Sequence, residues 1–168
     1  PPPASAPNRP RALHQSAALV VDGNPSTRMT LAGQLRGMGL QSVSQTSRIS
    51  EARRELERNP FDVVICGDQF PKGGGSGQEL LDDLRRSGLL PYATVFILLT
   101  DEATYLKVSE AAESSVDSYI VRPYSAGSLY DRIEQARLRK AALLPIYQAL
   151  EAQQPEEAVR LAHERVAA

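Results

Sequence analysis

The sequence predicts an α/β fold: a three-layer sandwich in which helices cover both faces of a doubly wound, five-stranded parallel sheet. The first observation is that five apolar runs alternate with amphipathic segments along the chain. The second is that most of these runs are continuously apolar, as in strands buried on both faces. Right-handed crossovers then place the strands in one parallel sheet. The expected strands are 17–21, a weaker one at 41–45, 62–66, 94–99 and 118–121.

Local signals mark where the helices between these strands begin. Asn24 precedes Pro25, which combines a capping side chain with a proline suited to the first helical position. Ser76 is followed three residues later by Glu79, the pattern of a capping box. Ser125 is expected to begin the fifth helix. The second and fourth helices are expected at 49–59 and 101–114.

The chain divides into three parts. Residues 1–15 are proline-rich and are expected to form a disordered tail. The predicted α/β domain spans residues 16–140. Residues 141–168 are expected to form a helical hairpin, because Pro145 should interrupt the fifth helix and two short helices follow, each opening with a proline. The apolar side of this hairpin is expected to need a partner and is formed by Ile146, Leu150, Val159 and Leu161.

Composition excludes several function classes. A hydrophobic content of 42% and a charged content of 23% are ordinary for a globular protein. A net charge of −1 gives no electrostatic footprint for nucleic acid. The longest apolar run, 94–99, is far shorter than the roughly 20 residues of a membrane-spanning helix. Cys66 is the single cysteine, so no internal disulfide can form, which favours a cytoplasmic location.

Sites in such a fold gather at the carboxyl ends of the strands. Four dipeptides stand there: Asp22-Gly23, Gly67-Asp68, Thr100-Asp101 and Arg122-Pro123. In this order and spacing they resemble the receiver domain of two-component response regulators, over about residues 16–140. The segments that carry the resemblance are ALVVDGNPSTR, FDVVICGDQFP, FILLT and DSYIVRPYS. The resemblance implies a flavodoxin-like sheet with strand order 2-1-3-4-5 in a bacterial signalling protein.

The chemistry implied by the resemblance is phosphoryl transfer from a partner histidine to an aspartate on the third strand, with Mg²⁺ held mainly by carboxylates. This chain departs from that pattern. Asp22 matches the first carboxylate of the acidic pair, but Gly23 stands in place of the second. Gly67 stands at the acceptor position by two measures, five residues after Asp62 and four before Pro71. Asp22 is then the only matching metal ligand, and we expect weak or absent Mg²⁺ binding and no other cofactor.

The other pocket positions are also altered. Thr100 fills the family's hydroxyl position, and Asp101 follows it where a small residue is usual. Arg122 replaces the family's lysine, so the charge is kept without the same geometry, and Arg122 is expected to pair with Asp22 or Asp101. The glycine-rich stretch 73–77 is longer than the family's usual loop.

Three functions fit these residues. The first is a pseudo-receiver, a non-enzymatic module that binds protein partners without phosphorylation. Its binding face would comprise the fourth helix, the fifth strand and the fifth helix, with Tyr119 at the switching-aromatic position and Tyr124 nearby. The C-terminal helices would extend this face; they resemble the start of a tetratricopeptide array, with Ala158 at a small-residue position. A homodimer is a further alternative.

The second function is a phosphorylatable response regulator that uses Asp68. Alternation along a strand should turn Asp68 away from the direction of residue 67, unless the glycine at 67 permits a bulge. The third is a flavodoxin-like protein that binds a small molecule at the same strand ends. Few aromatic residues stand near those loops to line such a pocket.

Overall fold

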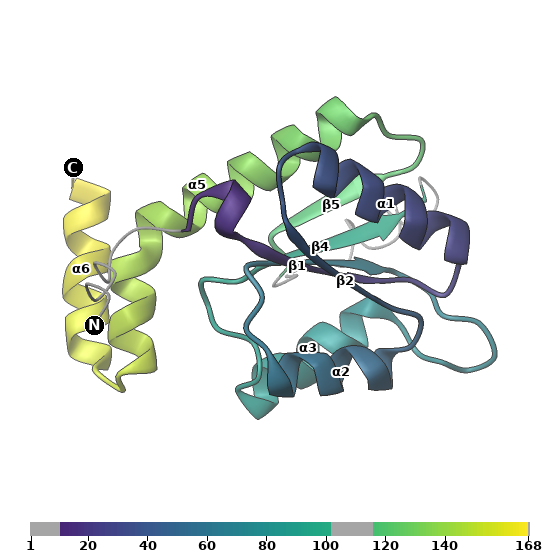
Figure 1. The fold of residues 1–168 in the computed structure, drawn as a ribbon. Helices are drawn as coiled ribbons and strands as arrows, with labels where there is room; N and C mark the ends of the chain where they lie inside the picture. The colour runs from purple at the N-terminus through teal and green to yellow at the C-terminus, as the bar shows by residue number, and fades with distance from the viewer. Residues whose placement is uncertain (1–10, 102–115, 168) are drawn as a thin grey trace, which may run out of the picture.

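The computed structural model describes residues 11–101 and 116–167 of the chain. A short 3₁₀ helix, Leu13–Gln15, leads into a parallel sheet whose strand order is β2-β1-β3-β4-β5 (Figure 1). This order confirms the expected fold class and topology. The strands are β1 (Ala17–Val21), β2 (Ser42–Thr46), β3 (Val63–Gly67), β4 (Val95–Thr100) and β5 (Ser118–Val121).

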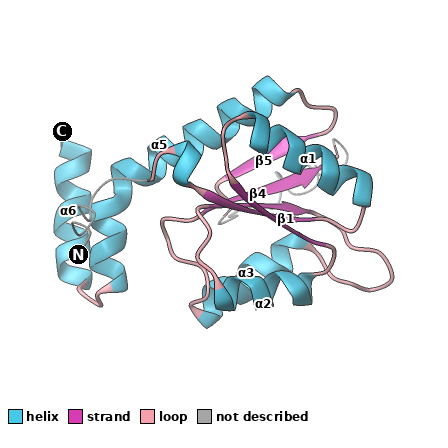
Figure 2. Cartoon of the chain, in the orientation of Figure 1, coloured by secondary structure: helices cyan, strands magenta, loops and turns pink. Residues whose placement is uncertain are grey.

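Helices cover both faces of the sheet (Figures 1 and 2). On one face lie α1 (Pro25–Gly37) and α5 (Ala126–Glu151); on the other lie α2 (Ile49–Arg58) and α3 (Gly77–Ser87). The predicted fourth helix, apart from Asp101, lies outside the described residues. The described elements form the three-layer sandwich that the sequence predicts.

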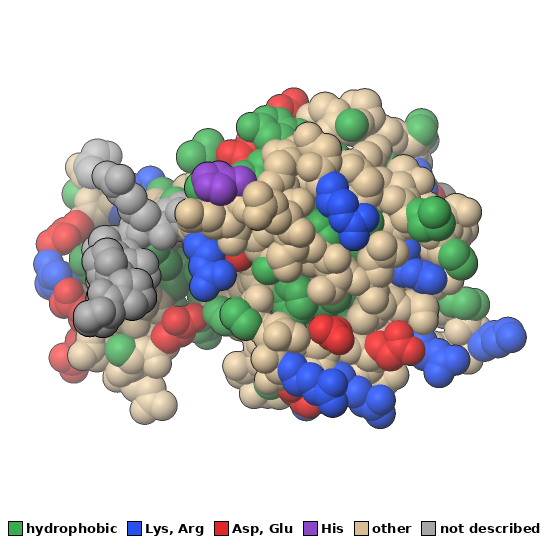
Figure 3. Space-filling model, in the orientation of Figure 1, with side chains coloured by type: hydrophobic (Ala, Val, Ile, Leu, Met, Phe, Trp, Pro, Cys, Tyr) green, Lys and Arg blue, Asp and Glu red, His purple; other side chains and the backbone are tan. Residues whose placement is uncertain are grey.

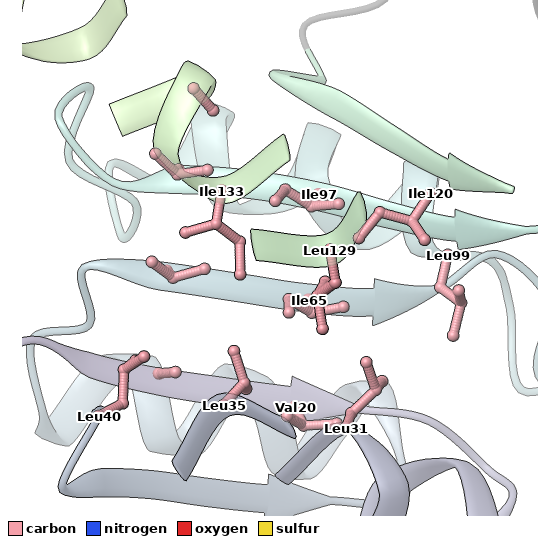
Figure 4. Packing of buried hydrophobic residues seen from close by; sticks show 14 residues of the cluster. Val20, Leu31, Leu35, Leu40, Ile65, Ile97, Leu99, Ile120, Leu129 and Ile133 are labelled. Carbon is pink, nitrogen blue, oxygen red and sulfur yellow. The ribbon is translucent and has the colours of Figure 1, made fainter. Parts of the chain in front are cut away.

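Two apolar clusters fill the space between the layers. Every residue of β3 and β4 is buried, which is why these strands are apolar without alternation. Figure 4 shows the cluster under α1 and α5, where side chains from helices and strands meet: Leu31, Leu35, Leu129 and Ile133 against Val20, Ile65, Ile97 and Ile120. The cluster on the other face includes Leu19, Val64, Phe96, Ala52, Leu56, Leu80 and Leu84.

The predicted helix starts are confirmed. The Asn24 side chain accepts hydrogen bonds from backbone N–H groups in the first turn of α1. Ser76 and Glu79 form a capping box at the start of α3. Ser125 caps α5 together with Ser128. These caps satisfy backbone donors that have no partner within the helix, and they begin the helices close to the strand ends.

Helix α5 contradicts the expected C-terminal boundary. It runs from Ala126 to Glu151 with Pro145 inside it, so the prediction that Pro145 interrupts the helix is wrong. The predicted domain boundary at residue 140 therefore falls within a helix. Tertiary contacts explain this result, because Lys140 and Tyr147, on either side of the proline, both contact Tyr92. Held on both sides, the helix tolerates the missing backbone N–H of Pro145.

A helical hairpin is present, but it consists of the second half of α5 and α6 (Pro155–Ala167), which lie side by side in Figure 1. Ala149 and Ala158 are both buried, one on each helix. Of the four residues expected on the apolar side, Ile146 and Leu161 are half-buried, while Leu150 and Val159 are exposed. Among the helices of the described residues, none is long and apolar enough to cross a membrane.

Candidate functional site

The carboxyl ends of the strands surround a cleft of about 460 Å³. Parallel strands bring their carboxyl ends to one edge of the sheet, so residues far apart in the sequence meet there. The structure brings all the predicted pocket residues together in the lining of this cleft: Asp22, Gly23, Gly67, Asp68, Thr100, Asp101 and Arg122.

Asp22 makes three polar contacts, two through its carboxylate and one through its backbone carbonyl. Its Oδ1 accepts a hydrogen bond from the Asn24 backbone N–H at 2.8 Å, and its Oδ2 lies 3.5 Å from Nη2 of Arg122. Its carbonyl oxygen accepts from Nη1 of Arg28 at 2.7 Å. The expected pairing of Arg122 with Asp22 is confirmed. Because the Arg122 side chain is 47% exposed, solvent weakens this ion pair.

Gly67 faces the Asp22 carboxylate at the end of β3. A Cβ atom added to Gly67 would lie 2.6 Å from Oδ2 of Asp22 and 3.3 Å from its Cγ. The first distance is shorter than real Cβ contacts allow, and the φ angle of Gly67 is not positive. The constraint at this position is therefore space. The Asp22 carboxylate occupies the volume that a side chain at position 67 would enter.

Asp68 has different neighbours from Gly67, although both line the cleft. Asp68 is 8% exposed, and its Oδ2 is buried without a hydrogen-bond partner within the described part of the chain. Burial raises the pKa of the Asp68 carboxyl; the Gln69 side chain lowers it, the charge of Asp101 raises it, and Thr100 lowers it. Position 67 thus faces β1, whereas Asp68 lies on the β4 side of the cleft.

Thr100 and Gly23 complete the walls of the cleft. Thr100 is buried, and its hydroxyl donates to the backbone carbonyl of Asp101 at 3.3 Å. A Cβ atom at Gly23 would lie 3.2 Å from Cδ of Pro71, so a larger side chain there would press on the loop after β3. The Arg122–Pro123 peptide bond, which leads away from β5, is cis.

The donor set of this cleft does not fit the Mg²⁺ ion that the resemblance implies. Mg²⁺ requires a regular shell of oxygen ligands, usually with one or two carboxylates free to coordinate. Asp22 has one oxygen bound to the Asn24 N–H and the other beside a guanidinium. Gly23 and Gly67 supply no side-chain oxygen. Asp68 and Asp101 also line the cleft, but burial raises the pKa of the Asp68 carboxyl and so disfavours the ionised form that binds a metal. Within residues 11–101 and 116–167, no group of three or more His, Cys, Asp or Glu side chains is placed to hold a metal ion.

The two tyrosines predicted on one interaction face lie on opposite faces of the sheet. Tyr119 packs against the cluster under α2 and α3. Tyr124 packs against the cluster under α1 and α5, and its hydroxyl donates to Oε1 of Gln34 at 3.2 Å. Burial raises the pKa of the Tyr124 hydroxyl, the charge of Arg122 lowers it, and Asp22 raises it. The structure therefore does not bring Tyr119 and Tyr124 together.

Two residues of α1 that were not predicted as part of the site also contribute to it: Arg28 donates to the Asp22 carbonyl, and Gln34 accepts from the Tyr124 hydroxyl. Both follow Asn24, the cap that starts α1 beside the cleft. Arg28 could have been predicted from its distance to this cap. It lies about one turn into α1, and the first turn of α1 is close to the end of β1.

Comparisons with known proteins agree with this architecture. The family model described as the response regulator receiver domain matches residues 18–134. The chemotaxis protein CheY-3 of Vibrio cholerae is 28% identical over 117 residues, which cover 70% of this chain and 88% of that protein. A response regulator receiver domain protein from Clostridium thermocellum superposes with a TM-score of 0.65 and 26% identity, covering 77% of this chain and 99% of that structure.

The fold is also that of the chemotaxis response regulator CheY4 of Vibrio cholerae, with a TM-score of 0.64 and 22% identity. This superposition covers 73% of this chain and 98% of that structure. The second half of α5 and all of α6 lie beyond residue 134, where the family match ends.

Proposed function

Since the chain belongs to the response regulator receiver domain family of two-component signalling, we propose that it acts in signal transduction as a phosphorylation-independent interaction module. The observation that carries this proposal is the glycine at position 67, with the Asp22 carboxylate in the space where a side chain would lie. A phosphoacceptor needs a nucleophilic side chain, and glycine has none. The Asp22 carboxylate fills the space that such a side chain would need.

The charge of the cleft supports the same proposal. Arg122 lies beside the Asp22 carboxylate, so part of the negative charge is already compensated within the chain. A carboxylate with a neighbouring guanidinium and a backbone N–H has its hydrogen-bonding needs largely met. Such a cleft has little need of a metal ion or a phosphoryl group to reach a stable arrangement.

Partner binding is proposed through β5 and α5, together with the fourth helix that the sequence predicts outside the described residues. The hairpin of α5 and α6 would extend this face. Leu138 of α5 is 68% exposed and Val159 of α6 is 56% exposed, so both helices of the hairpin carry exposed apolar side chains. The buried Ala158 fits the small-residue position of a tetratricopeptide-like helix pair. The partners would be proteins of the same cytoplasmic signalling system, with self-association as the alternative.

Incubation with acetyl phosphate and Mg²⁺, followed by intact-mass measurement, tests the proposal directly. The expected result is no base-labile phosphoryl adduct. A variant pair, Asp68→Asn and Asp22→Asn, serves to locate any adduct that does form. An adduct on the unmodified chain that disappears in Asp68→Asn would overturn the proposal.

That outcome would establish the second candidate function, a response regulator phosphorylated on Asp68. One observation favours it: Asp68 lines the cleft, and its Oδ2 has no hydrogen-bond partner among the described residues. The direction of its pKa opposes it, because burial disfavours the ionised carboxylate that attack on phosphorus requires. The balance favours the phosphorylation-independent module.

A further inference from the structure

A second recess, of about 670 Å³, lies beside the cleft and is lined by charge of one sign. Its walls come from the turn between β2 and α2 and from the loop after β3, and Gly23 separates it from the cleft. The charged residues of its lining are Arg48, Arg53 and Lys72, and no carboxylate belongs to its lining within the described residues. One carboxylate that contacts the lining is that of Glu51, which accepts hydrogen bonds from the Ser47 N–H and hydroxyl just before α2.

The outer wall of the recess is the glycine-rich loop, which is a hydrogen-bonded turn. The Phe70 N–H donates to the carbonyl of Gly75 at 3.0 Å, and Gln69 pairs with Ser76 in an antiparallel bridge. Lys72 stands at the tip with a φ of 57°, followed by Gly73 with a φ of 71°. These hydrogen bonds give the loop a defined conformation, and this conformation places Lys72 in the lining of the recess.

The floor of the recess is apolar, and the loop packs closely on it. Phe70, Pro71 and Ile49 line the recess. A Cβ atom at Gly75 would lie 3.2 Å from Cδ1 of Ile49, and the φ of Gly75 is 87°. Glycine at this position lets the loop backbone approach Ile49 at the start of α2. The glycine-rich insertion thus builds one side of a groove with a hydrophobic floor.

The three cations are not equivalent. Arg53 forms ion pairs with Glu57 and Asp83, so its charge is partly compensated. Arg48 and Lys72 are exposed, and neither forms an ion pair with the residues described by the structure. In Figure 3 both Lys or Arg and Asp or Glu side chains lie along the lower edge of the molecule, the edge formed by α2 and α3. The groove therefore presents two uncompensated positive charges beside an apolar floor.

We propose that this groove binds an acidic peptide segment of a partner protein, in which a hydrophobic side chain is flanked by Asp or Glu. The hydrophobic side chain would lie on Ile49, Phe70 and Pro71, where burial of apolar surface favours binding. The flanking carboxylates would pair with Arg48 and Lys72, which supply charge complementarity. The volume falls within the range of ordinary ligand pockets and accommodates one or two side chains.

Nucleic acid fits the same groove less well. Binding of unpaired bases relies on exposed aromatic rings that stack on them, and Phe70, the aromatic residue of this groove, is only 8% exposed. This proposal goes beyond the phosphorylation-independent function, because it assigns a different surface and stays valid whether or not Asp68 accepts phosphate.

A titration of the ¹⁵N-labelled full chain with the hexapeptide Asp-Glu-Leu-Leu-Asp-Glu tests it. Saturable shifts are expected for the amides of Ile49, Ser50 and Gly74, and they should weaken as salt is added. The double variant Arg48→Glu/Lys72→Glu should bind about tenfold more weakly. The matched control Arg36→Glu/Arg132→Glu makes the same change in net charge at exposed sites elsewhere and should bind within about twofold of the unmodified chain.

Three results would overturn the proposal. One is the absence of shifts at the groove amides at millimolar peptide. Another is equal binding of Asp-Glu-Ser-Ser-Asp-Glu, which would show that the apolar floor plays no part. The third is equal weakening by the control pair, which would reduce the effect to net charge. Tighter binding of an oligothymidylate at the same amides would assign the groove to nucleic acid instead.

Discussion

Tyr92 and Tyr147 stack with their ring centroids 5.7 Å apart and their planes within 10° of parallel. Tyr92 lies between α3 and β4, whereas Tyr147 lies in α5 beyond Pro145. The Tyr92 N–H also donates to Oε1 of Glu151 at 3.0 Å, and its carbonyl accepts from Nζ of Lys140 at 2.5 Å. The loop before β4 therefore fixes the C-terminal half of α5 to the sheet domain, together with Asp117 before β5, which contacts Arg139 and Lys140.

Replacing Tyr147 with alanine should lower the free energy of unfolding by about 1–2 kcal/mol, because the stacked pair and part of its apolar contact are lost. Urea denaturation measures this change, and hydrogen exchange should show faster opening of residues 141–151. Tyr130→Ala, at an exposed tyrosine of the same helix, should change stability by less than about 0.5 kcal/mol. Equal effects of the two variants would show that the stack contributes nothing specific.

Adding a methyl group at Gly67 should destabilise the fold through its contact with Asp22. Gly67→Ala is expected to cost about 1 kcal/mol, since Oδ2 of Asp22 would lie 2.6 Å from the new Cβ and must move. In an Asp22→Ala background the same change should cost about 0.5 kcal/mol less, because the space is then free. Urea denaturation of the four proteins of this cycle gives the coupling. Strict additivity would contradict the assignment of the Asp22 carboxylate to that space.

Gly77, the first residue of α3, should be the least replaceable glycine of the sheet domain. A Cβ atom there would lie 2.5 Å from both the carbonyl oxygen of Gly67 and Cδ2 of Leu98. Gly77→Ala is expected to cost about 3 kcal/mol because backbone must move. Gly33→Ala, where nothing lies within 4 Å, should stabilise α1 by about 0.5–1 kcal/mol. Thermal unfolding of the two variants should shift in opposite directions.

The raised pKa of Asp68 predicts a pH-dependent stability. Between the ordinary carboxyl range and the raised pKa, the folded state binds more protons than the unfolded state, so stability falls as pH rises through this window. Asp68→Asn cannot ionise, so its stability relative to the unmodified chain should increase from acid to neutral pH. Urea midpoints measured across this range provide the comparison. An advantage of Asp68→Asn that grows toward acid pH would contradict the direction.

Most of the fold could be predicted because it depends on local signals. The strands are continuous apolar runs, and caps such as Asn24 and Ser76 act on neighbouring backbone. Pro145 was mispredicted for the opposite reason. Its effect on α5 is decided by Lys140 and Tyr147, whose partner Tyr92 is distant in sequence and gives no periodic signal.

The site was predictable in membership but not in arrangement. Their positions at strand ends were enough to predict that Gly67 and Asp22 line one cleft. That the Asp22 carboxylate lies where a side chain at position 67 would lie depends on the direction of the Asp22 side chain, which the sequence does not give. The groove with Arg48 and Lys72 could not be inferred, because it requires the close packing of the glycine-rich loop on Ile49. Tyr119 and Tyr124 were assigned to one face, although the sheet separates them.

The continuity of α5 has a mechanical consequence. A helix of 26 residues is about 39 Å long, so a tilt of about 5° at its first turn would displace its last turn by about 3 Å. Its first turn follows the cis Arg122–Pro123 bond at the cleft, and its far end is fastened to Tyr92. Helix α5 is thus attached to the sheet domain at both of its ends. Force applied to the hairpin by a partner would reach both the Arg122 side of the cleft and the loop that precedes β4.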